Sequence, residues 1–137
     1  MSGARSGAFL EHGPQTGGAA GAGSSTTAQF TQQVVIVREA LMEAARDKGD
    51  FPIAKRVYIA VDDDADRARE RVRATLRAFY GDAMPDLTPV AVVGPPEVCA
   101  RGLREVIDAG AERVLLNPMF DEAEQMERLV AEVVPQL

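Results

Sequence analysis

The chain has 137 residues, of which 46% are hydrophobic and 26% are charged, a composition typical of one globular domain with an ordinary core. Its formal net charge of −6 and its 5% aromatic content argue against a nucleic-acid surface, which needs rows of basic residues and aromatic rings. With one cysteine and one histidine, the chain can form neither an internal disulfide nor a Cys/His zinc cluster. No apolar run approaches the ~20 residues that span a bilayer. We therefore expect a cytoplasmic protein with no metal and no membrane or nucleic-acid partner.

The first 27 residues divide into a leader and a hinge. Residues 1–20 are rich in Gly, Ala and Ser and show no regular apolar period, so we expect an irregular leader. The hinge follows as glycines that give way to hydroxyl residues, namely Gly21, Gly23, Ser24, Ser25, Thr26 and Thr27. From Thr27 an apolar period of three to four residues predicts a helix that ends near Asp47.

The middle of the chain reads as a strand followed by a helix. The segment IAKRVYIAV, up to Val61, is apolar on both faces toward its end, as in a strand buried within a parallel sheet. Asp62, Asp63 and Asp64 follow at once, and aspartate is a favoured helix cap. The next helix runs to about Tyr80. Its predicted inner stripe consists of Ala65, Ala68, Val72, Leu76 and Phe79.

The last third repeats this alternation. VAVVG is either a brief strand or an extended lead-in, and Pro95 and Pro96 suit the start of a helix that stops at Gly110. RVLLN, residues 113–117, is predicted to be a second buried strand. Asp121 can cap the last helix, whose predicted apolar side consists of Met126, Leu129, Val130 and Val133. Alternating helices and strands indicate an α/β fold with a parallel sheet and right-handed crossovers.

Four stretches taken together resemble the C-terminal part of the luciferase-like monooxygenase family. They are GAGSSTTAQF, FPIAKRVYIAVDDD, VVGPPEVCARGLREVIDAGAERVLL and LLNPMFDEAEQMERLVAEVVPQL. The resemblance covers residues 21–137 and depends on the order and spacing of these segments. It implies a partial (β/α)₈ TIM barrel made of the last βα units with parallel strands, because a whole barrel typically needs ~250 residues. Residues 1–20 depart from the family, which would place a barrel strand there.

The resemblance also implies a function. It implies a flavin- or deazaflavin-dependent oxidoreductase or monooxygenase domain, with FMN or a deazaflavin coenzyme as cofactor and a small-molecule substrate. Such an incomplete barrel is expected to show little activity alone, and its exposed edges could join copies into a homo-oligomer. The alternative is a non-catalytic α/β remnant that serves as a binding or interaction module.

Two groups of residues are candidates for cofactor binding. Glycines allow close backbone approach, hydroxyls donate hydrogen bonds and a helix start attracts anions, so the hinge from Gly21 to Thr27 could hold a phosphate. The other interpretation is that Thr26 or Thr27 only caps the helix. Asn117 stands at the carboxyl end of a barrel-type strand, where ligand residues gather, although Asn-Pro is also good turn chemistry. No catalytic residue is identified, and Cys99 is expected to be an apolar packing residue.

Overall fold

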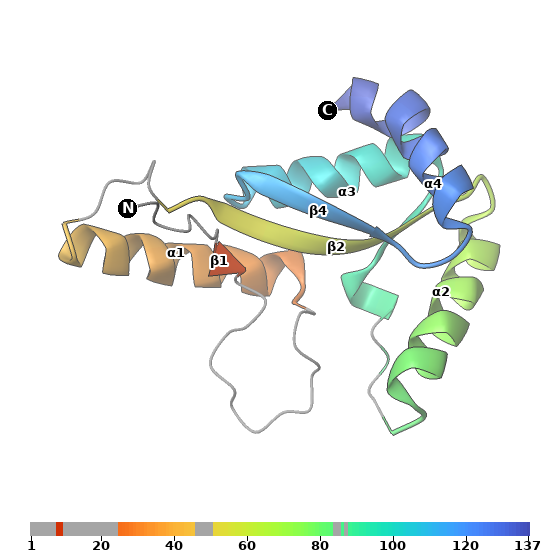
Figure 1. The fold of residues 1–137 in the computed structure, drawn as a ribbon, viewed down its shortest axis with the longest axis horizontal. Helices are drawn as coiled ribbons and strands as arrows, with labels where there is room; N and C mark the ends of the chain where they lie inside the picture. Colours follow the sequence, from red (N-terminus) through yellow and green to blue (C-terminus); the bar gives the residue numbers. More distant parts are fainter. Residues whose placement is uncertain (1–7, 10–24, 46–50, 84–85, 87) are drawn as a thin grey trace. The chain divides into compact units, whose positions relative to one another are not determined.

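The computed structural model describes residues 8–9, 25–45, 51–83, 86 and 88–137 (Figure 1). Helices and strands alternate along the chain, as the sequence predicts. Their bounds are β1 (Ala8–Phe9), α1 (Thr27–Glu43), β2 (Ile53–Val61), α2 (Ala65–Tyr80), β3 (Val92–Gly94), α3 (Pro96–Asp108), β4 (Arg113–Pro118) and α4 (Glu122–Arg128). After α4 the chain continues through a π-helical turn, Leu129–Val133, and a 3-10 turn, Val134–Gln136. None of the described helices combines the length and apolar character needed to cross a membrane.

The sheet is organised around β2. Strand β1 pairs with the start of β2 in parallel, with Ala8 opposite Ile53. Strand β3 pairs in parallel with the end of β2, where Val61 lies opposite Gly94. Strand β4 also pairs with β2. The parallel α/β sheet expected from the alternating pattern is therefore present, and VAVVG does contribute a short strand. The two residues of β1 are a strand that the apolar pattern of residues 1–20 does not predict.

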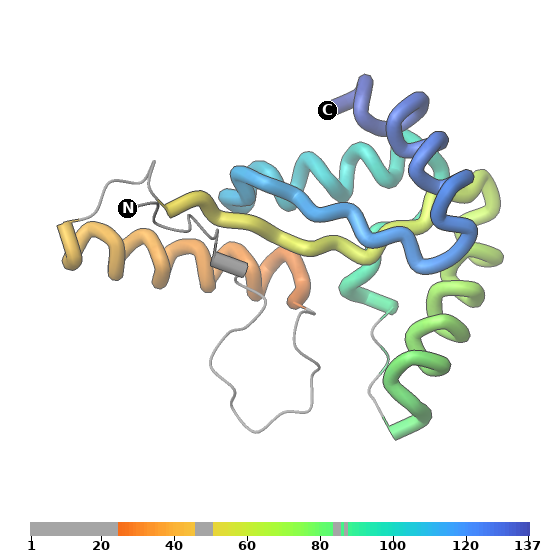
Figure 2. Tube along the Cα trace, viewed as in Figure 1, coloured from red at the N-terminus to blue at the C-terminus, as the bar shows by residue number. Residues whose placement is uncertain are grey.

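Contacts divide the chain into two compact units, residues 1–56 with 106–115 and residues 57–105 with 116–137. The tube in Figure 2 follows the chain as it leaves the first unit within β2 and returns to it within α3. In the first unit α1 buries Phe30, Val34 and Leu41. Gly110, at φ +120°, lies so close to α1 that a Cβ there would stand 2.7 Å from Cγ1 of Val34. The predicted helix stop at Gly110 therefore coincides with a tight contact.

The core of the second unit lies around the carboxyl half of β2. It brings together side chains from β2, α2, β3 and the turn after β4. The buried members of this cluster are Tyr58, Ala60, Ala68, Val72, Leu76, Val93 and Met119. Three of the five residues predicted for the inner stripe of α2 are thus in the core. Phe79 is not a core residue, since 72% of its surface is exposed.

Strand β4 and the last helix differ from their predicted burial. In the first four residues of β4, exposed side chains alternate with half-buried ones, and Leu115 is 52% exposed. One face of β4 is therefore uncovered within the described part of the chain. Leu129 and Val133 are fully buried as expected, whereas Met126 and Val130 are 43% and 62% exposed. The large exposed apolar side chains of the first and last helical segments are Val35, Ile36, Met42, Met126, Val130, Val134 and Leu137.

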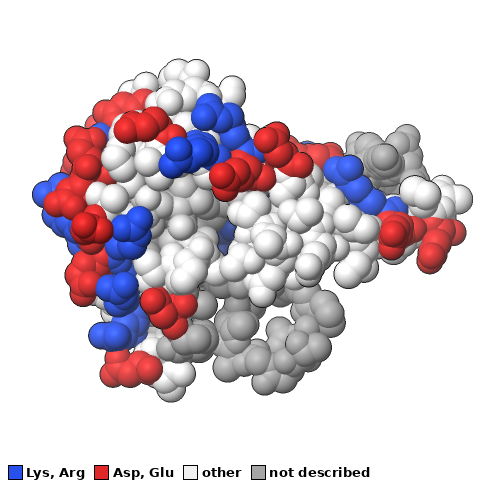
Figure 3. All heavy atoms as spheres, turned by 180° about the vertical axis from the view of Figure 1, so that it is seen from behind, with Lys and Arg blue, Asp and Glu red and all other residues white. Residues whose placement is uncertain are grey.

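Charged side chains of both signs are intermingled on the surface (Figure 3). Helix α2 carries much of this charge, with Arg69 paired to Asp66 and Arg73 paired to Glu70 along its exposed side.

Candidate functional site

Helix α1 begins directly after the hinge with a capping box, in which Thr26 and Gln29 bond each other reciprocally. The N–H of Gln29 donates to Oγ1 of Thr26 at 3.2 Å, and the N–H of Thr26 donates to Oε1 of Gln29 at 2.9 Å. The capping interpretation of Thr26 is therefore confirmed. This contact uses a lone pair of the Thr26 hydroxyl and leaves its proton free to donate. The N–H groups of Thr27 and Ala28 belong to the first turn, where a helix offers no internal acceptor. The first turn contains no acidic residue, so none of its own side chains places a carboxylate at the positive end of the helix dipole.

Ser25 precedes this helix start and is buried, with 6% of its surface exposed. Its Oγ has no hydrogen-bond partner among the residues that the structure describes. A buried hydroxyl without a partner is costly, and such groups often mark a place that a ligand atom or water completes. The chemistry of Ser25, Thr26 and the free N–H groups suits an anionic oxygen group. Gly21, Gly23 and Ser24 lie outside the described residues.

Asn117 is the fifth residue of β4 and is half-buried. Its side chain forms no hydrogen bond with any residue in the described ranges. It belongs to the second unit, whereas Ser25, Thr26 and Thr27 belong to the first. The structure therefore brings the three hydroxyl residues together at the start of α1, and it describes Asn117 separately at the end of a strand.

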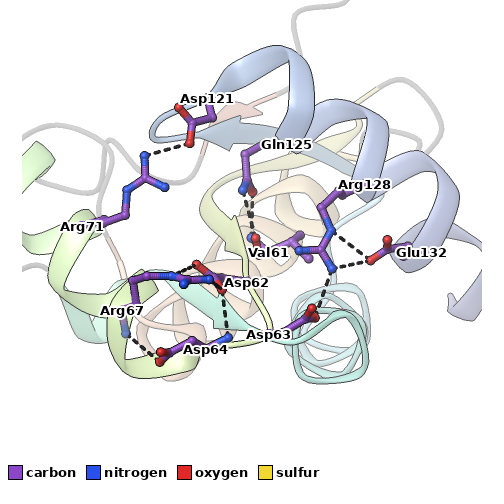
Figure 4. A network of polar contacts seen from close by, with 10 residues as sticks. All are labelled: Val61, Asp62, Asp63, Asp64, Arg67, Arg71, Asp121, Gln125, Arg128 and Glu132. Carbon is purple, nitrogen blue, oxygen red and sulfur yellow. Dashed lines mark hydrogen bonds and ion pairs between the residues drawn. The ribbon is translucent and has the colours of Figure 1, made fainter.

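The three aspartates after β2 are engaged by protein groups (Figure 4). Asp62 accepts two hydrogen bonds from Arg67, at 2.6 Å and 3.0 Å, and one from the N–H of Asp64. The hydrogen bond from Arg67 lowers the pKa of Asp62, against the opposing effect of burial. Asp64 caps α2 by accepting from the N–H of Arg67 at 3.0 Å. The capping interpretation is confirmed, and the described residues contain no cluster suited to a metal ion.

Gln125 contacts the same strand end and has no counterpart among the residues predicted to be functional. Its Oε1 accepts from the N–H of Val61 at 2.7 Å, and its Nε2 donates to the carbonyl of Val61 at 2.9 Å. The buried amide of Gln125 thus bonds β2 as a neighbouring peptide group would (Figure 4). One sequence signal could have found it, since Gln125 stands four and eight residues before Leu129 and Val133, on the apolar side of the helix.

Arg128 ties the last helix to the loop that follows β2, because it donates to Asp63 at 3.1 Å. It also donates to Glu132, one turn further along the same helical segment, at 2.7 Å. The hydrogen bond to Glu132 is the main cause that raises the pKa of Arg128. Asp121 does not cap α4 as predicted. Its backbone is left-handed, with φ +47°, its side chain makes no capping bond, and its carboxylate instead accepts from Arg71 at 2.8 Å.

Cys99 is a packing residue, as the sequence indicates. It is fully buried, and its Sγ lies 3.3 Å and 3.6 Å from the carbonyl oxygens of Gly94 and Ala60, which share its single S–H. Burial raises the pKa of this thiol to about 12. The thiolate that nucleophilic catalysis requires is therefore scarce at neutral pH.

No protein-family model and no curated protein matches the chain. Solved structures do match it. A coenzyme F420-dependent tetrahydromethanopterin reductase from Methanopyrus kandleri superposes with a TM-score of 0.63 at 19% identity, over 82% of this chain and 43% of the reductase. An F420-dependent secondary alcohol dehydrogenase, solved with an F420-acetone adduct, gives 0.68 at 16% identity, over 82% and 41%.

An FMN-bound protein matches as well. The oxygenating constituent of 3,6-diketocamphane monooxygenase from Pseudomonas putida, solved with FMN, gives a TM-score of 0.53 at 15% identity, over 82% of this chain and 41% of its own. The chain thus spans less than half the length of these three proteins. It therefore shares a partial TIM-barrel fold with these two F420-dependent enzymes and this FMN-bound protein.

Proposed function

We propose that the chain forms part of a flavin- or deazaflavin-dependent oxidoreductase, in which the hinge from Gly21 to Thr27 binds the phosphate of the cofactor and Asn117 contacts the ligand. The observation that carries the proposal is the start of α1, where the buried Oγ of Ser25 and the N–H groups of Thr27 and Ala28 have no partner among the described residues. The fold shared with F420- and FMN-dependent enzymes supports this choice of cofactor.

Each group in the hinge has a role that follows from its chemistry. The N–H groups of Thr27 and Ala28 and the hydroxyls of Ser25 and Thr26 donate to phosphate oxygens, while the dipole of the 17-residue helix α1 favours the negative charge. The bound cofactor supplies hydride or oxygen chemistry. An anchor on its phosphate binds ground and transition states equally, so it gives affinity without raising the rate. We therefore expect the 137-residue chain, supplied with FMN, to turn over no faster than free cofactor.

The test is FMN and inorganic phosphate titration monitored by backbone amide resonances. We expect the first shifts at residues 25–28. Ser25→Ala should weaken binding several-fold and leave stability unchanged or higher, because it removes an unpaired buried hydroxyl. The control is Thr31→Ala, since the Thr31 hydroxyl is exposed and donates to the carbonyl of Thr27. Binding that resists Ser25→Ala, or shifts confined to other residues, would refute the hinge site.

A non-catalytic interaction module is the second candidate. The specific observation in its favour is the apolar surface left exposed on the last helical segment, where Val130 is 62% exposed. If FMN causes no shifts anywhere while the chain captures a protein partner through that segment, the interaction module is the better account.

A further inference from the structure

The turn that follows β4 is held in an unusual backbone conformation. Asp121 has φ +47° and ψ +48°, a left-handed geometry that residues with a side chain adopt at a cost, although aspartate tolerates it better than most. On its N-terminal side Met119 is buried, and Phe120 packs against the core cluster while remaining half-buried. A contact with another part of the chain must therefore offset the cost of the left-handed backbone of Asp121, which lies between the buried Met119 and the start of α4.

Arg71 contacts two residues of this turn, Phe120 and Asp121. Its guanidinium carbon lies 3.8 Å from the centre of the Phe120 ring, a stacked cation–π arrangement. Its Nη2 donates to Oδ2 of Asp121 at 2.8 Å. Figure 4 shows the Arg71 side chain reaching from α2 toward Asp121. The base of the contact is fixed, because Ala68 and Val72 on the same helix are fully buried.

The rest of α4 is held by separate contacts. Gln125 bonds both polar backbone groups of Val61, and Arg128 bonds Asp63. Loss of Arg71 would therefore release the turn at residues 119–121 without detaching the helix. This separation makes Arg71 specific to the turn.

We infer that Arg71 is a positioning residue, which clamps Phe120 and Asp121 and so holds the carboxyl end of β4, with Asn117, in one conformation. Three residues separate Asn117 from the clamped Asp121, and one of them is the buried Met119. A planar guanidinium suits this role because one side chain stacks on a ring and pairs with a carboxylate at once. The inference depends on the proposed function only for what Asn117 contacts.

The clamp can be tested on the chain without any cofactor. In Arg71→Ala we expect amide hydrogen exchange at Gln125, whose N–H donates to the carbonyl of Asp121 at 2.9 Å, to rise about tenfold, as expected for the loss of a cation–π contact and an ion pair together. Exchange at Val61, whose N–H donates to the side chain of Gln125, should stay unchanged. Arg69→Ala is the matched control, because Arg69 lies on the same helix and pairs with the exposed Asp66.

A spectroscopic signature separates positioning from general stability. The ring current of Phe120 should shift the side-chain signals of Arg71, and Phe120→Leu should abolish that shift. The side-chain amide signal of Asn117 should move in Arg71→Ala and return partly in Arg71→Lys, which keeps the charge without the planar group.

The outcomes divide clearly. Exchange in Arg71→Ala that equals exchange in Arg69→Ala, or an unmoved Asn117 signal, overturns the clamp whatever FMN does. Loosening of the turn with unchanged FMN affinity supports the clamp and removes Asn117 from the proposed binding site.

Discussion

The bond between Gln125 and Val61 gives the sharpest test of the structure. Val61 is 1% exposed and Gln125 is 5% exposed, so water has little access to the two backbone groups that the amide satisfies. Gln125→Leu keeps much of the side-chain volume and removes both hydrogen bonds. Each buried group left without a partner costs roughly 1–3 kcal/mol, and the apolar side chain offsets part of this, so we expect a loss of about 2–4 kcal/mol.

A second substitution at the same position adds a dependence on pH. In Gln125→Glu, only the protonated carboxyl group can both accept from the N–H of Val61 and donate to its carbonyl. Folding therefore raises the pKa of the new group above its unfolded value of about 4.3. The favourable contact is complete below that unfolded pKa and is lost as pH rises through the folded pKa. The deficit of this variant should grow with pH, whereas that of Gln125→Leu should not.

The assay is urea unfolding followed by circular dichroism, for the native chain and both variants, at several pH values from about 5 to about 8. Gln136→Leu is the control, since its Nε2 donates to the carbonyl of Glu132 at an exposed position and the change should stay within about 0.5 kcal/mol. If Gln125→Leu costs no more than Gln136→Leu, the Val61 groups have another partner and the reasoning is wrong.

Three other predictions follow from single residues. Gly110→Ala should cost about 2–4 kcal/mol by urea unfolding, because its Cβ would meet Val34 at 2.7 Å, whereas Gly81→Ala, at φ +83° with open space, should cost only about 1 kcal/mol. Asp62→Asn should flatten the acid limb of a melting temperature profile, because the lowered pKa of Asp62 gives stability that is present above its unfolded pKa and lost as pH falls through the folded value. A melting curve with the native acid limb would contradict this. Cys99 should react with a thiol reagent only as fast as the chain opens, so rapid labelling of the native protein would show that the thiol is accessible.

The sequence predicts the features that depend on neighbouring residues. The caps at Thr26 and Asp64 and the helix stop at Gly110 are local, because a hydroxyl, a carboxylate or a missing Cβ acts within one helical turn. The fold class follows from the alternation of such elements.

Features that depend on distant partners were missed. Asp121 reads as a cap until Arg71, 50 residues earlier, draws its carboxylate away. Leu115 reads as a core residue because its side chain is apolar, but burial requires an element packed over that face of β4. Of the candidate site, the cap at Thr26 could be foreseen, whereas the buried Oγ of Ser25 could not, because a lone serine before a helix carries no signal of burial.

The exposed apolar side chains on α1 and on the last helical segment affect the solubility of the chain. At neutral pH its net charge of −6 makes molecules repel one another and keeps Ile36 or Val130 of different molecules apart. That repulsion fades near the isoelectric point of about 4.8 and is screened by salt. Dilute, low-salt and mildly alkaline solutions should therefore keep the chain dispersed, and acidification should bring it out of solution before it unfolds.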